Sequence, residues 1–161
     1  MLSDEDLLSG EAPFSAADIQ DIVIAQLTAS PLLSEYSSEI LDDDPGKAEP
    51  GQVLIALHLL GEGDRDATLG GREAGTRTYV SYFAALCYVG EANRDPAAKR
   101  QLTVLSRRVR EVLMQLRSDP TGAQLWYKNQ FKRPAATLYQ KGSAFRRSIT
   151  FIEFHSRIRT Q

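Results

Sequence analysis

The sequence predicts an α+β fold: a largely antiparallel β-sheet flanked by two main helices, with a long loop between the first two strands. Two segments have the apolar spacing of amphipathic helices, and two others alternate as strands around a Gly-rich stretch. A further strand pattern closes the chain. The 161 residues suffice for a substantial core. We therefore expect a single domain at residues 15–161, preceded by an N-terminal arm at residues 1–14.

The first predicted helix begins at Ser15, whose hydroxyl can accept from a free backbone amide, with Asp18 in the first turn. Its apolar positions recur at helical spacing: Ile19, Ile22, Val23 and Leu27. Pro31 interrupts this helix, and residues 31–41 can form a second, short one. Residues 42–51, "DDDPGKAEPG", are predicted to be a loop, and we interpret their three aspartates as a solvated turn rather than a cation site.

Two strands follow. Residues 52–60, "QVLIALHLL", have two largely apolar faces, as an interior strand does, and His58 is expected in the core or at a sheet edge. Residues 76–91 are predicted to be a long antiparallel partner, with Cys87 as a small core residue. The Gly-rich, charged residues 61–75 between them are predicted to be a long, flexible loop, and loops of this size inside a compact domain are usually functional or disordered.

The strongest helix prediction covers residues 96–117, which Asp95 caps and Pro96 opens. One face is apolar and comprises Leu102, Leu105, Val109, Val112, Leu113 and Leu116. The remaining surface is basic and comprises Lys99, Arg100, Arg107, Arg108, Arg110 and Arg117. Residues 123–131 and 135–142 are weaker strand candidates.

The last strand, within residues 146–161, should present two different faces. Thr150, Ile152, Phe154 and Ile158 suit the core. The opposite face starts apolar and becomes charged, with His155 expected at the surface and Arg157 and Arg159 at a rim.

The net charge of −2 conceals a strong asymmetry. Residues 1–75 contain sixteen acidic and three basic residues, whereas residues 76–161 contain sixteen basic and five acidic residues. Two interpretations remain open. The halves can neutralise each other across the fold, or the molecule can carry one acidic and one basic surface and stack head-to-tail.

Motifs for catalysis, cofactors or metals are missing from the sequence. Gly61-Glu62-Gly63 lacks the third glycine and following helix of a dinucleotide site. Residues 64–75 begin like a calcium loop, but Leu69 and Gly75 stand where Gly and Glu are required. Two His and one Cys, widely separated, do not form a zinc site. We predict no catalytic, cofactor or metal site and no enzyme, although a site assembled from distant residues remains a third alternative.

Composition also bounds location. No apolar run reaches membrane-spanning length, and the acidic start lacks the features of a signal peptide, so we expect a cytosolic protein without a membrane partner. The basic helix at 96–117 could bind nucleic acid by counterion release, which makes a small binding module an alternative. Trp126 and Tyr127, interleaved with basic residues, have an interface composition.

The order of elements resembles the tail terminator (tail-completion) proteins of long-tailed bacteriophages. The segments that carry the resemblance are "ADIQDIVIAQLTAS", "GQVLIALHLL", "TRTYVSYFAALCYVG", "LTVLSRRVREVLMQL" and "RSITFIEFHSRIRTQ". The resemblance implies a non-catalytic hexameric ring that caps the tail tube, ends its polymerisation and joins it to the head-side connector. DNA would only pass through the lumen. The expected location is the virion tail or neck, and the host cytoplasm during assembly. Another neck or head-tail connector protein is the related alternative.

Under this hypothesis the functional residues are interaction residues. The loop at residues 61–75 should project from the sheet and touch a partner ring, and Arg157 and Arg159 should contact an acidic surface on a neighbouring subunit or on the tube. We expect them to be Arg65, Arg72, Trp126, Tyr127, Arg146, Arg147, Arg157 and Arg159. The expected partners are further copies of the chain, the tail tube protein and the connector.

Overall fold

The computed structural model describes residues 16–65, 76–91, 96–116, 128–131, 136–139 and 144–159. The predictions for the arm at 1–14, for Ser15 and for Asp95 lie outside these ranges. The described elements are, in order, α2 (Ala16–Ala29), the 3₁₀ helix η1 (Pro31–Glu39), β1 (Ile40–Leu41), β2 (Val53–Arg65), β3 (Thr76–Gly90), α3 (Pro96–Gln115), β4 (Lys128–Phe131), β5 (Ala136–Tyr139) and β6 (Phe145–Arg159).

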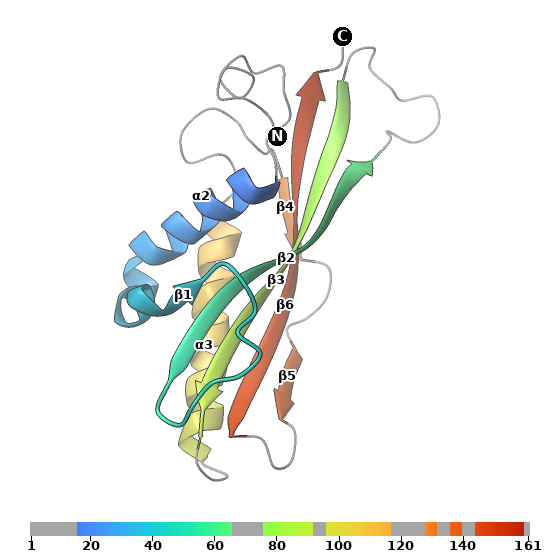
Figure 1. The fold of residues 1–161 in the computed structure, drawn as a ribbon. Coiled ribbons are helices and arrows are strands. Elements are labelled where there is room, and N and C mark those ends of the chain that lie inside the picture. Colours follow the sequence, from blue (N-terminus) through green and yellow to red (C-terminus); the bar gives the residue numbers. More distant parts are fainter. Residues whose placement is uncertain are drawn as a thin grey trace.

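The described strands form a six-stranded sheet in the order β1-β2-β3-β6-β4, with β5 also paired to β6 (Figure 1). Every pairing is antiparallel except that of β1 with β2. The helices α2 and α3 lie on one side of the sheet, and the ends of β2 and β6 extend beyond them (Figure 1). The α+β class and the largely antiparallel sheet are therefore confirmed. No helix in the described ranges is both long and apolar enough to span a bilayer.

Strand β2 is longer than the sequence predicts. It continues through Gly61–Arg65, which pair with β3, so the first third of the predicted 61–75 loop is strand. A register shift between Leu59 and Gly61 allows this continuation, since a bulge inserts an extra residue without ending the ladder. The first two strands in chain order are β1 and β2, and residues 42–52 form the long connection between them.

The main core lies between the helices and one face of the sheet. The predicted stripe of α3 is buried in full, as are Ile19, Val23 and Leu27 of α2. Phe83 of β3 packs edge-on against Phe154 of β6, with ring centroids 5.7 Å apart. Because the helices contribute only apolar side chains at these positions, hydrophobic burial holds this side of the molecule together.

Cys87 is confirmed as a core residue. It is buried in the main core, where its thiol contacts Ser106 on α3 and Ser148 on β6, whose hydroxyls also share a hydrogen bond. Burial raises the pKa of the Cys87 thiol to about 11, against the opposing hydrogen bonds of the two serines. The thiol is therefore protonated at neutral pH and unreactive.

The two histidines differ from each other. His58 is half-buried near the sheet edge, where its Nδ1 lies 2.8 Å from Asp43 Oδ1, as expected for an edge position. The prediction that His155 is a surface residue is wrong: it is 3% exposed, and its Nε2 lies 3.0 Å from Glu153 Oε2. Strand alternation assigns both residues to one face of β6, but it does not show whether that face is covered.

Candidate interaction surfaces

A smaller apolar cluster covers the second face of the sheet. It comprises Ala48, Leu54, Ala56, Ala84, Leu86 and Tyr88. Ala48 comes from the connection between β1 and β2, which therefore folds over this face. We call residues 42–49 of this connection the acidic loop, since it contains four carboxylates and one lysine. It lies on the opposite side of the sheet from α3.

Tyr88 attaches the acidic loop to the sheet. Its hydroxyl donates to Asp44 Oδ1 at 2.5 Å, and the same carboxylate oxygen accepts from the Gly46 amide at 2.8 Å. Gly46 has a φ of 74°, a conformation that glycine adopts without steric cost. The three aspartates are thus a turn, as predicted, but Asp44 is also bound to the sheet.

Electrostatics favours the ionised form of Asp44. Burial opposes ionisation, but the hydrogen bonds from Tyr88 and Gly46 and the charges of Arg147 and His58 outweigh it and lower the pKa of Asp44. Burial, and then the hydrogen bond to Asp44, raise the pKa of Tyr88. Both directions keep Tyr88 a donor and Asp44 an acceptor at neutral pH.

At its far end, the connection between β1 and β2 is fixed because its backbone lies close against the end of β3. The Gly90 amide donates to the Gln52 carbonyl at 2.8 Å, and the Gln52 amide donates to the Glu49 carbonyl at 2.9 Å. A Cβ at position 90 would overlap the Glu49 carbonyl oxygen. Only glycine therefore lets the connection cross β3 at this point.

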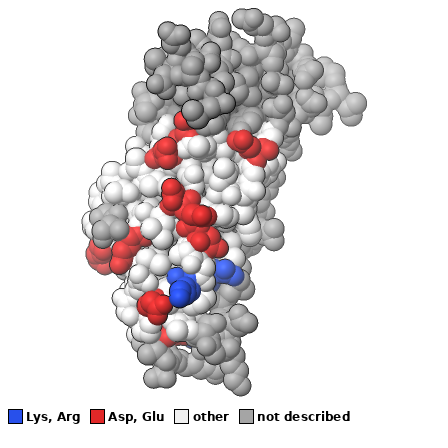
Figure 2. All heavy atoms as spheres, viewed as in Figure 1, with Lys and Arg blue, Asp and Glu red and all other residues white. Residues whose placement is uncertain are grey.

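One side of the molecule is acidic. Asp42, Asp43 and Glu49 are exposed, and Figure 2 shows acidic side chains over the acidic loop and also over α2 and η1, which pack on the other face of the sheet. The Lys47 ammonium lies 3.5 Å from Glu49, and both side chains are well exposed. An ion pair of that kind is weak, and the four carboxylates of the acidic loop outnumber this one lysine, so the loop has a net negative charge.

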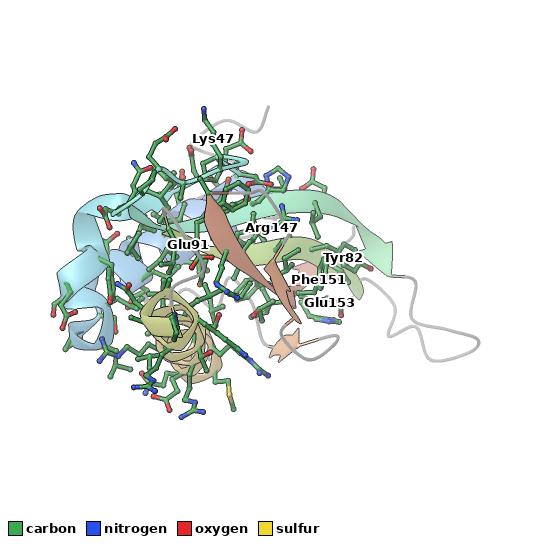
Figure 3. The ribbon with its side chains drawn as sticks, turned by 90° about the horizontal axis from the view of Figure 1, so that it is seen from below. Lys47, Tyr82, Glu91, Arg147, Phe151 and Glu153 are labelled. Atoms are coloured by element: carbon green, nitrogen blue, oxygen red, sulfur yellow. The ribbon has the colours of Figure 1, made fainter. Side chains whose placement is uncertain are left out.

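The outward face of α3 is mainly basic, with apolar positions and the exposed Glu111 among the arginines. Arg100 and Arg107 are exposed, Arg108 is partly exposed, and Val104 and Met114 are 43% and 57% exposed. These five residues, which we call the basic helix face, recur at helical spacing. Figure 3 shows α3 on one side of the sheet with nitrogen-tipped side chains pointing outward, and Lys47 on the other.

A groove of about 490 Å³ lies on the sheet beside the bulge. Its lining is apolar except for Glu153 and comprises Leu60, Gly61, Tyr82, Phe83, Phe151, Ile152 and Glu153. Tyr82, Phe151 and Glu153 lie together on β3 and β6 (Figure 3). Since Glu153 already contacts His155, the groove suits an apolar side chain better than acid–base chemistry. No cluster of metal-ligating side chains occurs within the described ranges.

Two of the predicted interaction residues make contacts within the chain. Arg146 is 13% exposed, and its Nε lies 3.1 Å from Glu91 Oε1, which joins the start of β6 to the end of β3. The Arg147 guanidinium lies 6.0 Å from the centroid of the Tyr88 ring, and its Nη1 donates to the Tyr88 hydroxyl at 3.4 Å. These contacts give both arginines a structural role; an interface role stays a prediction.

The strand pairing places three other predicted interaction residues near one another. Arg65 on β2 and Arg157 on β6 are both Cα partners of Thr78, and Arg159 is the partner of Thr76. All three positions therefore lie at the end of the sheet that extends beyond the helices. Arg72, Trp126 and Tyr127 fall outside the described residues, so their predicted roles stay untested.

Several residues were missed by sequence reasoning. Glu62, assigned to a loop, accepts from the Ala16 amide at 3.2 Å and so supports the start of α2. Tyr88 and Gly90 fix the acidic loop through contacts distant in sequence, for which no local signal exists. Val104 and Met114 could have been found, because they are apolar residues on the polar side of a predicted helix.

No protein-family model and no curated protein matches this sequence. Among solved structures, the chain is similar to a chain of the virion of a native gene transfer agent (GTA) particle. The TM-score is 0.59 at 17% sequence identity, and the similarity covers 89% of this chain and 98% of that chain. The two chains therefore share a fold over almost their whole lengths.

Proposed function

We propose that this protein is a structural component of a phage virion, a tail terminator. It forms a ring that caps the tail tube, ends its polymerisation and joins it to the head-side connector. The observation that carries the proposal is the fold shared, over almost the whole of both chains, with a chain of a gene transfer agent virion. The resemblance of the sequence to tail terminators supplies the finer assignment.

The shape and surfaces of the chain support a role in assembly. The acidic loop and the basic helix face lie on opposite sides of the sheet, which suits repeated head-to-tail contacts. The positions of Arg65, Arg157 and Arg159 at the extended end of the sheet suit contact with a tube or connector protein. In this proposal the ring is hexameric, binds no cofactor, catalyses no reaction and contacts DNA only as it passes through the lumen.

Electron microscopy of the purified protein, alone and added to tail tubes, tests the proposal. A ring with sixfold symmetry seated at one end of the tube is expected, and tubes should stop growing when it is added. If tubes stay uncapped and continue to grow in the presence of the protein, and no ring forms, the assignment to tail terminators is contradicted. A ring bound only to the head-side connector would favour the neck-protein alternative.

The double substitution Arg157→Glu and Arg159→Glu tests the extended end of the sheet. If these arginines contact an acidic surface of a neighbouring subunit or the tube, the variant should fold normally and cap tubes at least about tenfold less well, because like charges then face each other. Capping is measured by counting terminated tubes, and folding by circular dichroism. An unfolded variant would instead show that the two arginines are structural.

Nucleic-acid binding by α3 is the second candidate, favoured by the exposed Arg100 and Arg107. It predicts DNA affinity that falls steeply with salt concentration. Affinity that is lost on Arg107→Glu, without any effect on assembly, would favour this function over the ring.

A further inference from the structure

The basic helix face has the chemistry of a protein interface. Within the part of the chain that the structure describes, Arg100, Arg107 and Arg108 make no ion pair. Val104 and Met114 lie among them on the same side of α3 and expose apolar surface. Phosphate binding requires only the cations, whereas arginine and methionine together are enriched at protein–protein interfaces. The face therefore favours a protein partner with an acidic surface.

The acidic loop is a surface of the required charge and is already ordered. Tyr88 holds it at Asp44, and the approach at Gly90 holds it at Glu49. Asp42 and Glu49 keep their carboxylates exposed, because the bonds that fix the loop use the side chains of Asp43 and Asp44 and the backbone. A pre-ordered loop loses little conformational entropy when it is bound, which favours association.

The two surfaces cannot meet within one molecule. The acidic loop packs on the sheet face that contains Tyr88, whereas α3 packs on the face that contains Cys87. Figure 3 shows the sheet lying between them. Complementary surfaces on opposite sides of a subunit generate a head-to-tail contact, which closes into a ring when the rotation between copies permits it.

We propose that the basic helix face of one copy binds the acidic loop of the next copy, and that this is the contact between neighbouring subunits. The inference rests on the proposed ring and names the surfaces that build it. A symmetric contact of α3 with α3 is disfavoured, because each face carries three arginines against one carboxylate, Glu111, so that like charges outnumber opposite ones.

Two charge reversals provide the test. The helix variant carries Arg107→Glu and Arg108→Glu, and the loop variant carries Asp42→Lys and Glu49→Lys. The loop variant keeps Asp43 and Asp44, so the attachment of the loop to Tyr88 and His58 is retained. In each variant alone, the helix face and the loop have the same sign, and the association constant should fall by about tenfold or more.

Mixing distinguishes this contact from all others. In an equimolar mixture, the helix face of the helix variant is acidic and can bind the basic loop of the loop variant. The helix face of the loop variant is still basic and can bind the acidic loop of the helix variant. Assembly of the mixture should therefore recover to within about threefold of wild type. The measurement is sedimentation at low salt, with native mass spectrometry to show that the two variants alternate.

Each outcome has a separate meaning. A wild-type chain that stays monomeric in every condition, with or without tail tubes, contradicts the ring and this contact together. A wild-type chain that assembles, with variants that assemble equally well or do not recover on mixing, contradicts only this contact. If the helix variant loses DNA binding while assembly is unchanged, the basic helix face serves nucleic acid instead.

A matched control separates local contact from overall charge. Lys99→Glu makes the same change of net charge as Arg107→Glu, but Lys99 lies on the flank of α3, outside the basic helix face. It should weaken assembly by less than about twofold. An equal effect of the two single substitutions would show that net charge, rather than this contact, controls assembly.

Discussion

The two faces of the sheet differ in what covers them. The helices α2 and α3 and the 3₁₀ helix η1 bury one face through a broad set of apolar side chains. The acidic loop covers part of the other face and is held by a few individual contacts, at Tyr88 and Gly90. The first face is stabilised in proportion to buried area, whereas the second depends on single groups.

This difference indicates which face of the sheet tolerates substitutions better. A core that is stabilised by a large buried apolar area keeps its fold when one side chain is replaced by another of similar volume. The acidic loop is held by a few single groups, among them the Tyr88 hydroxyl, the His58 ring and the close approach at Gly90, so many other contacts do not offset the loss of one. Substitutions on the two faces should therefore differ in kind, and three of them test the comparison.

The largest effect is expected on the helix-covered face. Phe83→Ala should reduce the free energy of unfolding by about 4 kcal/mol, because it removes a fully buried ring and its contact with Phe154. Urea unfolding measures this loss. Phe151→Ala, at a partly buried ring on the other face, is the matched control and should cost about half as much. Equal losses of unfolding free energy in the two variants would show that the two faces of the sheet contribute equally to stability.

Gly90→Ala tests the close approach of the loop. The added Cβ would overlap the Glu49 carbonyl oxygen, so the connection must move, at a cost of about 2 kcal/mol. Urea unfolding again provides the measurement. Gly61→Ala is the control, since a Cβ there meets no atom within 4 Å. If both variants are equally stable, the connection is not held against β3 as the structure indicates.

The smallest effect is expected for Tyr88→Phe. It removes the hydrogen bond to Asp44 and the long hydrogen bond from Arg147, and should reduce the free energy of unfolding by about 1 kcal/mol, since Asp44 is partly hydrated. Tyr82→Phe is the control, because the Tyr82 hydroxyl makes no hydrogen bond to a described residue. A larger loss at Tyr82 than at Tyr88 would be inconsistent with the proposed attachment of the loop.

The effect of Tyr88→Phe should depend on pH. The pKa of Asp44 is lowered in the folded protein, so its contribution is present above its ordinary value of 3.8 and is lost as pH falls through the folded pKa. The difference in stability between wild type and Tyr88→Phe should therefore narrow below about pH 4. NMR titration of the Asp44 carboxyl should show a higher pKa in the variant. If the pKa of Asp44 is the same in the variant, the hydrogen bond from Tyr88 does not lower it.

Much of the fold was predictable, because local pattern decides it. The apolar stripe of α3, from Leu102 to Leu116, is visible in the sequence and is buried as expected. The buried state of Cys87 also follows from its apolar neighbours. The end of β2 did not follow, because Gly61 and Gly63 favour a loop locally while pairing with β3 retains them in the sheet.

The candidate surfaces were predictable only in part. The opposite charges of the two halves are a property of the sequence, and an acidic and a basic surface was one of two interpretations. The burial of His155 could not be foreseen, since alternation assigns a face without showing what covers it. The attachment of Asp44 to Tyr88 joins residues 44 positions apart in the chain.

The sequence by itself determined the α+β class, the two main helices and the uneven distribution of charge. These follow from periodicity and composition, which act over a few residues at a time. Only the tertiary structure decided that the acidic loop and α3 lie on opposite faces of one sheet. It did so because strand register and backbone packing, rather than local pattern, place residues that are distant in sequence beside one another.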